Sequence, residues 1–268
     1  MTISNKKPVA MITGASSGIG AVYAQRFAAR GYDLILISRR ADRLKDLSAD
    51  LHLSYATNTT ILPIDLTIET DLKNAESVIT TTPALKVLVN SAGNGKLGAT
   101  TDIAAADLAS TLTLNVTALT RLTYAALTEF LSRDQGTIIN ISSVMALHSS
   151  AITSLYSGTK AFVLNFSRGL QQELKGTQVR VQVVLPATTA TEFHDQSGIP
   201  LSAFSPSAIM TTENLVDAAL AGFDQGELVT LPSVHDISLW NTYESARNTL
   251  FVATQNGFSA PRYNHAHS

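Results

Sequence analysis

The chain has 268 residues, of which 45% are hydrophobic and only 15% are charged, against about 25% charged residues in a typical globular domain. This composition excludes a disordered chain, and the length favours one or two domains. The net charge of −2 argues against nucleic-acid and anionic-membrane partners, and the absence of cysteine excludes disulfides and thiolate-bound zinc.

Short apolar segments alternate along the chain with longer segments of helical periodicity. The apolar segments are rich in Val, Ile and Leu on both faces, which is typical of a parallel sheet covered on both sides. The expected strands are 9–13, 34–38, 60–64, 87–90, 137–142, 179–185 and 227–231. The expected helices are 18–30, 40–54, 69–80, 104–131, 153–174 and 212–224, with a further helix at about 236–254. The alternation predicts a doubly wound α/β fold, a single domain over residues 1–268.

A glycine-rich loop joins the first strand to the first helix. Its sequence is Thr13-Gly14-Ala15-Ser16-Ser17-Gly18-Ile19-Gly20. Glycines let the backbone approach a pyrophosphate closely, and the N-terminus of the following helix presents free N–H groups to it. The pattern therefore predicts a dinucleotide site, and the alternative is an ordinary glycine-rich turn.

Two arginines follow the second strand, where dinucleotide folds often carry an acidic residue for the adenosine ribose. Arg39 and Arg40 instead offer planar guanidinium groups that suit a 2′-phosphate. We therefore expect NADP(H) rather than NAD(H), although both arginines could also be solvated cations that open the next helix. Asp65, after the third strand, is either a partner of the adenine amino group or a simple turn residue.

Tyr156 and Lys160 lie four residues apart on an expected helix and so share one face. An ammonium near a phenol lowers the pKa of the phenol, which could then exchange a proton with an alkoxide or an alcohol. Alone, such a pair is more often packing plus a solvated cation. Ser143 supplies context, because it ends a strand at the edge of the sheet where ligands bind and could hydrogen-bond a substrate carbonyl. Ser142 is the neighbouring alternative.

Asn115 falls on an otherwise apolar stripe of the helix 104–131. The stripe comprises Leu108, Leu112, Asn115, Leu119, Leu122 and Ala126. A buried amide needs hydrogen-bond partners, so Asn115 marks either a helix irregularity that holds a water or a polar residue in a seam between helices.

In order and spacing, these motifs resemble those of the short-chain dehydrogenase/reductase superfamily in its shorter, non-extended form. The loop 13–20 matches TGxxxGxG, Asn90-Ser91-Ala92-Gly93 matches NxAG, and residues 156–160 match YxxxK. The resemblance covers about residues 8–195. It implies a Rossmann-type sheet of seven parallel strands in the order 3-2-1-4-5-6-7 with helices on both faces, and a catalytic tetrad.

The resemblance also implies a role for each motif residue. Tyr156 would be the general acid/base, Lys160 would lower its pKa and hold the nicotinamide ribose, Ser143 would orient the carbonyl, and Asn115 would keep a water in a proton relay. The cofactor residues would be Gly14, Ser16, Ser17, Gly18, Ile19, Arg39, Arg40, Asp65, Leu66, Asn90, Ala92, Gly93, Tyr156, Lys160, Pro186, Thr188 and Thr191. No metal site is expected.

Two positions depart from the family pattern. Ala187 follows Pro186 where the family commonly has glycine, and alanine adopts positive φ less cheaply, so we expect a different loop over the nicotinamide. Ser91 replaces a usual asparagine, which is a mild change.

The family places a substrate lid at 187–210. Here the segment is rich in apolar residues and has no lysine or arginine, which indicates a neutral, partly apolar ketone, aldehyde or alcohol. These apolar residues could instead pack the lid or an interface. Met145, His148 and Phe193 are the candidate substrate contacts. The segment 233–268 has no assigned role.

The sequence thus predicts an NADPH-dependent oxidoreductase that reduces a carbonyl to an alcohol, or the reverse. The alternatives are an NAD-linked alcohol dehydrogenase and a non-catalytic protein that senses NADP(H). No apolar run has the length of a signal peptide or a membrane span, so we expect a cytoplasmic protein. The family buries the helices 104–131 and 153–174 between subunits, which would explain the shortage of charge and predicts a homodimer or homotetramer.

Overall fold

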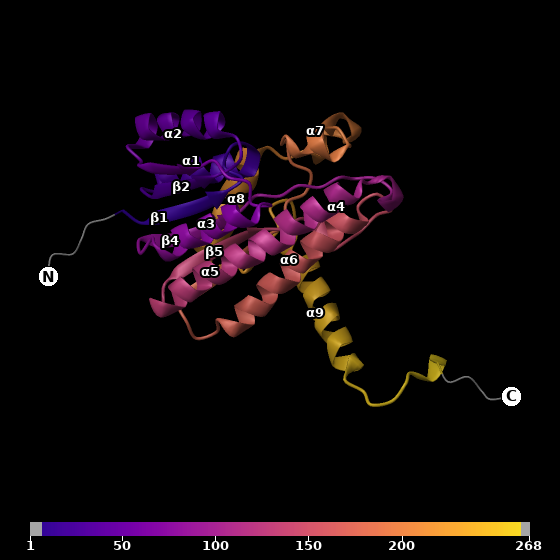
Figure 1. The fold of residues 1–268 in the computed structure, drawn as a ribbon. Helices are drawn as coiled ribbons and strands as arrows, with labels where there is room; N and C mark the ends of the chain where they lie inside the picture. The colour runs from indigo at the N-terminus through magenta and orange to yellow at the C-terminus, as the bar shows by residue number, and fades with distance from the viewer. Residues whose placement is uncertain (1–6, 264–268) are drawn as a thin grey trace. The chain divides into compact units, whose positions relative to one another are not determined.

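The computed structural model describes residues 7–263. Over these residues, seven parallel strands form one sheet in the order β3-β2-β1-β4-β5-β6-β7, which confirms the predicted fold and strand order (Figure 1). The strands are β1 (Val9–Thr13), β2 (Asp33–Ile37), β3 (Thr59–Leu62), β4 (Leu85–Asn90), β5 (Gly136–Ile141), β6 (Val179–Val184) and β7 (Val229–Thr230).

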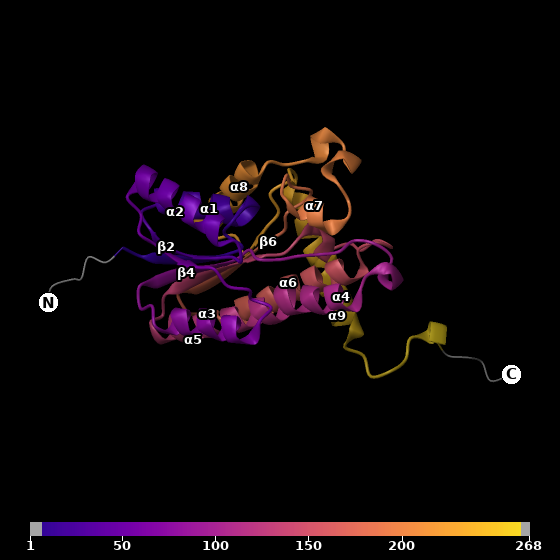
Figure 2. The ribbon, with the colours of Figure 1, turned by 45° about the horizontal axis from the view of Figure 1, so that its top comes forward.

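Helices cover both faces of the sheet (Figure 2). One face carries α1 (Gly18–Ala29), α2 (Ala41–Tyr55) and α8 (Thr212–Gln225), and the other carries α3 (Glu69–Thr80), α5 (Leu119–Ser132) and α6 (Ser154–Glu173). The remaining helices are α4 (Ala105–Leu112), α7 (Phe193–Ser197) and α9 (Ile237–Thr254). Short 3-10 turns occupy η1 (Thr100–Asp102), η3 (Val144–Ala146), η4 (Leu201–Ala203), η5 (Pro206–Ala208) and η6 (Pro261–Tyr263).

Alternate residues of the central strand enter two different cores. Ala10 and Ile12 of β1 pack with Phe27 and other residues on the side of α1 and α8, whereas Met11 packs with Phe130 on the side of α3 and α5. All of these side chains are fully buried. A strand with two covered faces has no solvent-facing positions, which explains why the strand sequences read as continuous apolar runs.

The prediction of one regular helix over residues 104–131 is wrong. It is divided into α4, a π-helical turn η2 (Thr113–Ala118) and α5. The wide turn changes the phase of the preceding residues, so Thr111 is buried and Leu112 of the predicted stripe is 46% exposed. The expected strand 227–231 is also too long, because only Val229 and Thr230 pair with β6.

The chain divides into two compact units, Met1–Ser233 and Val234–Ser268. The first contains the whole sheet. In the second, α9 has no buried residue, and its Leu239, Leu250 and Phe251 are each more than 60% exposed. No helix among residues 7–263 combines the length and the apolar character needed to cross a membrane.

Candidate active site

A cleft of about 1030 Å³ lies along the carboxyl ends of the strands, within the first unit. The loops that follow six strands, β1 to β6, contribute to its wall. In a parallel sheet these loops meet at one edge, where open α/β proteins bind their ligands. The cleft therefore brings together residues that are far apart in the sequence, from Gly14 to Phe204.

The loop after β1 forms a cradle that only glycine permits. Gly14 and Gly18 have φ of +69° and +53°, a region that other residues rarely adopt. A Cβ atom on Gly20 would lie 2.3 Å from the carbonyl oxygen of Gly14, and one on Gly14 would lie 3.0 Å from the backbone of Ala92. Together with the N-terminus of α1, this close-packed cradle fits a dinucleotide pyrophosphate. Ser16, Ser17 and Ile19 line it as expected.

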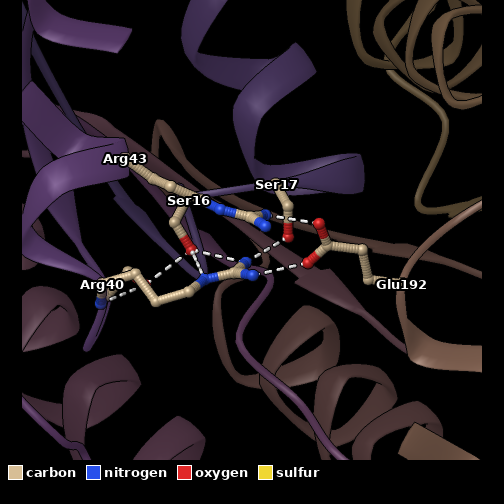
Figure 3. A network of polar contacts seen from close by, with 6 residues as sticks. Ser16, Ser17, Arg40, Arg43 and Glu192 are labelled. Atoms are coloured by element: carbon tan, nitrogen blue, oxygen red, sulfur yellow. Dashed lines mark hydrogen bonds and ion pairs between the residues drawn. The ribbon is translucent and has the colours of Figure 1, made fainter. Parts of the chain in front are cut away.

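Arg40 joins this loop to the segment that follows β6 (Figure 3). Its Nε donates to Ser16 Oγ at 3.0 Å, its Nη2 to Ser17 Oγ at 2.5 Å, and its Nη1 to Glu192 Oε2 at 2.5 Å. The other carboxylate oxygen of Glu192 accepts a hydrogen bond from Arg43. Hydrogen bonds from Arg40 and Arg43 lower the pKa of Glu192 to about 2, so the carboxylate is charged at neutral pH.

Arg39 is less engaged than Arg40. Its side chain is 69% exposed, and its Nη1 lies 3.7 Å from Asp65 Oδ2. Asp65 Oδ1 accepts hydrogen bonds from the backbone N–H of Thr67 at 2.9 Å and from its hydroxyl at 2.8 Å, so it does serve the turn. Asp65 and Leu66 also line the cleft, which leaves the adenine role compatible with their positions.

Ser143, Tyr156 and Lys160 all line the cleft. Ser143 lies just after β5, at the start of η3, and hydrogen-bonds the phenol of Tyr156. Lys160 Nζ donates to the carbonyl oxygen of Ile141 at 3.0 Å and lies 5.7 Å from the centre of the Tyr156 ring. Ser142, the alternative, donates to the carbonyl oxygen of Lys160 at 2.7 Å and is thereby committed to holding α6.

In the free protein, burial is the largest cause of the pKa shifts of Tyr156 and Lys160. Burial raises the pKa of the phenol to about 12, and the hydrogen bond with Ser143 acts in the opposite direction. Burial also lowers the pKa of Lys160 to about 8. The physical reason is desolvation, which disfavours the charged form of both groups.

Asn115 lies in the π-helical turn, which agrees with the predicted helix irregularity, while the water that it would hold stays a prediction. Its Oδ1 accepts from the backbone N–H of Asn94 at 2.9 Å, and its Nδ2 donates to the carbonyl oxygen of Asn94 at 2.8 Å and to Thr159 Oγ1 at 3.1 Å. Both ends of the amide are thus occupied. Asn115 fixes the loop after β4 against α6.

Asn90 does not line the cleft, which differs from its expected place beside the cofactor. It is 2% exposed, and its Nδ2 donates to Thr123 Oγ1 and Asn140 Oδ1 below the sheet edge. The next residues do reach the cleft, and the N–H groups of Ser91 and Ala92 both donate to Thr13 Oγ1, at 3.0 and 2.9 Å.

The segment after β6 closes the other side of the cleft. Pro186, Thr188 and Thr191 line it as expected, and the methyl group of Thr191 lies 3.1 Å from the Cβ position of Gly18. Ala187 is not among the residues with positive φ, so the loop avoids the conformation that glycine would allow.

The expected substrate residues Met145, His148 and Phe193 all line the cleft. The rings of Phe193 and Tyr156 lie 5.2 Å apart at 43°. Sequence reasoning missed Gly95, where an added Cβ atom would lie 2.7 Å from Tyr156 Cδ2. It also missed the partnership of Glu192 with the arginines, because residues 152 positions apart give no local signal.

A family model described as short chain dehydrogenase matches residues 8–199. The chain belongs to the short-chain dehydrogenase family. The cradle above is the part of this chain that fits a dinucleotide cofactor. Among residues 7–263, no group of acidic and histidine side chains could hold a metal ion.

Solved members of the family cover almost the whole chain. A short-chain dehydrogenase from Sphingobium yanoikuyae in complex with NADPH is 41% identical, with a TM-score of 0.92 over 96% of this chain and 100% of that one. An alcohol dehydrogenase from Comamonas testosteroni, described as specific for bulky-bulky ketones, is 37% identical, with a TM-score of 0.88 over 97% of this chain and 100% of that one.

Curated relatives match a shorter part. The very-long-chain 3-oxoacyl-CoA reductase-A of Danio rerio is 34% identical over 194 residues, which are 68% of this chain and 58% of that protein. The chain thus spans about three fifths of the length of the first of these relatives.

Proposed function

We propose that this short-chain dehydrogenase uses NADPH to reduce a neutral, largely apolar ketone to a secondary alcohol, or catalyses the reverse reaction. One observation carries the proposal. A single cleft holds the Arg40–Ser16 cluster at one end and the Ser143–Tyr156–Lys160 cluster beneath Phe193 at the other.

Ser143, Tyr156 and Lys160 each have a separate role at the substrate carbonyl. When bound, the nicotinamide cofactor supplies the hydride that reduces the carbonyl carbon. Ser143 donates a hydrogen bond to the carbonyl oxygen, and the Tyr156 hydroxyl gives the same oxygen its proton. The phenol of Tyr156 stays protonated to about pH 12 in the free protein, so the donor is present at neutral pH. The Lys160 ammonium stabilises the phenolate that remains.

The charge near the adenosine end supports NADPH. Arg39 and Arg40 follow β2, Arg40 binds Ser16 of the glycine-rich loop, and Arg43 lies one turn further along. The acidic residue that would suit a free ribose 2′-hydroxyl is absent from the end of β2. The relative from Sphingobium yanoikuyae, described in complex with NADPH, points the same way.

The aromatic side of the cleft supports an apolar substrate. The ring of Phe193 packs at a tilt against Tyr156, and His194 makes edge contacts with both Phe193 and Phe204. Met145 and Ile152 complete this wall. A wall of this kind suits the two hydrocarbon arms of a bulky ketone, the substrate class named for the relative from Comamonas testosteroni.

The test is NADPH oxidation with ketones whose two arms grow stepwise from methyl to phenyl. We expect kcat/KM to rise with arm size and Tyr156→Phe to lower it by about 10²–10⁴-fold, the usual contribution of general acid catalysis. NADPH binding should survive in Tyr156→Phe. An undiminished rate in that variant would contradict the assignment of Tyr156, and a preference for acetone over diaryl ketones would contradict the substrate class.

A further inference from the structure

We propose that Glu192 sets the cofactor specificity of this protein by competing with the 2′-phosphate of NADP(H) for Arg40 and Arg43. This inference deepens the proposed function and rests on its assignment of the arginines to the adenosine end of the cofactor. Glu192 is not part of the motifs that identified that site.

The first step is geometric. Glu192 belongs to the segment after β6, whereas Arg40 and Arg43 belong to the start of α2, on the far side of the phosphate loop. Each carboxylate oxygen of Glu192 binds a different arginine, so the two guanidinium groups are bridged by one acid (Figure 3). Arg40 also donates to Ser16 and Ser17. Glu192 thus binds Arg40, whose side chain is the least exposed of Arg39, Arg40 and Arg43.

The second step concerns donors. A phosphate bound here would need guanidinium N–H groups, which it accepts two at a time in a planar fork. Glu192 already accepts one from Arg40 and one from Arg43. Arg39, with its side chain 69% exposed and 3.7 Å from Asp65, is the arginine with the weaker partner. Full use of Arg40 and Arg43 by a 2′-phosphate therefore requires Glu192 to give up hydrogen bonds.

The third step concerns charge. The carboxylate is ionised at neutral pH and offsets part of the positive potential of the two guanidinium groups. A 2′-phosphate carries nearly two negative charges and would be repelled by a carboxylate that shares its arginines. A cofactor with a free 2′-hydroxyl meets neither penalty. Glu192 therefore weakens the binding of NADP(H) but not that of NAD(H), and so reduces the difference in affinity between the two cofactors.

The test is calorimetric binding of NADPH, NADH and 2′-AMP to the wild-type protein and to Glu192→Gln. Glutamine keeps the size of the side chain and removes its charge. We expect Glu192→Gln to bind NADPH and 2′-AMP roughly 3- to 10-fold more tightly, with the NADH affinity unchanged. Glu76→Gln is the matched control, because Glu76 lies on α3, outside the lining of the cleft, and also forms an ion pair with an arginine, Arg121 of α5. It should bind all three ligands as the wild type does.

Two outcomes would overturn the inference. In the first, Glu192→Gln binds NADPH and 2′-AMP as tightly as the wild type does, or more weakly. In the second, Glu192→Gln binds NADPH, 2′-AMP and NADH more tightly by the same factor. The last would mean that Glu192 acts through the segment after β6 and not through the phosphate. Glu192→Ala repeats the comparison if the glutamine still bridges the arginines. Wild-type protein that binds NADH as tightly as NADPH would contradict the proposed function, while the change in 2′-AMP affinity would still decide the role of Glu192.

Discussion

Lys160 Nζ donates a hydrogen bond to the carbonyl oxygen of Ile141 at 3.0 Å, in a place where the lysine is only 6% exposed. Burial lowers the pKa of this lysine from 10.5 to about 8. Between these two values the unfolded chain binds a proton that the folded chain does not, so stability rises with pH over this range. Below about pH 8 the folded protein bears the full cost of the buried ammonium.

Lys160→Met should therefore stabilise the cofactor-free protein at pH 7. The shift corresponds to about 3 kcal/mol at most, and the lost hydrogen bond to Ile141 returns about 1 kcal/mol, which leaves a gain of about 2 kcal/mol. The variant should also lose the rise in stability between pH 8 and 10 and most of its ketone reduction. Urea unfolding at several pH values measures this. Lys73→Met, which replaces an exposed lysine, is the control and should leave both the pH dependence of stability and the rate of ketone reduction unchanged. A Lys160→Met variant that is less stable than the wild type at pH 7 would contradict the prediction.

Asn115→Leu should lower stability by about 2–4 kcal/mol. The leucine leaves the N–H and the carbonyl of Asn94 without their amide partners, and both groups are held at 2.8–2.9 Å in the native protein. Asn94→Ala is the control, because it keeps those backbone bonds and removes only a side chain. Thermal unfolding should rank wild type, Asn94→Ala and Asn115→Leu in descending order. Equal effects of the two variants would show that the Asn94 backbone does not depend on Asn115.

Gly95→Ala should lower kcat by at least about tenfold while the NADPH affinity stays within about twofold, because a small displacement of a catalytic group has a large cost. The new methyl group would lie 2.7 Å from Tyr156 Cδ2 and must displace that ring. Gly158→Ala is a matched control two residues from Tyr156, where the added Cβ atom meets nothing within 4 Å. Steady-state kinetics and cofactor titration measure both. Similar kcat values for the two variants would contradict the displacement of Tyr156.

Sedimentation should show a dimer or tetramer that Tyr124→Glu with Phe162→Glu converts to smaller species. These side chains of α5 and α6 are 73% and 40% exposed, and a subunit interface would explain such apolar residues on helices with few charges. Tyr55→Glu removes a side chain of α2 whose exposure, 42%, is similar to that of Phe162, and it should leave the assembly intact. A wild-type monomer at micromolar concentration would refute the prediction.

The strands were predictable because their chemistry is continuous in the sequence. Residues such as Ala10, Met11 and Ile12 are buried on both sides of the sheet, so no solvent-facing position interrupts the apolar run. Helix continuity was harder. Asn115 interrupts the apolar stripe of residues 104–131, but the partner of its amide in the π-helical turn is Asn94, 21 residues away, which the local sequence does not indicate.

The residues of the candidate site were likewise predictable only where they are close in the sequence. Tyr156 and Lys160 share a helix face, so their spacing alone placed them together, and Gly14 and Gly18 stand within one loop. Glu192 and Arg40 come from opposite sides of the sheet edge, and only the folded chain brings them to 2.5 Å. The displacement of Asn90 from the cleft likewise depends on Asn140, 50 residues away. The cytoplasmic location, the assembly and the residue roles stay predictions.

The two hydrogen bonds that Thr13 accepts from Ser91 and Ala92 join the loops after β1 and β4 into one unit. Residues 193–210 make none of these contacts, whereas Thr191 and Glu192 touch the dinucleotide half through Gly18 and Arg40. Replacements within 193–210 can therefore change the substrate wall, while an exchange that includes Thr191 or Glu192 also changes the cofactor site. For protein engineering, residues 193–210 are accordingly the part of the segment to exchange between relatives.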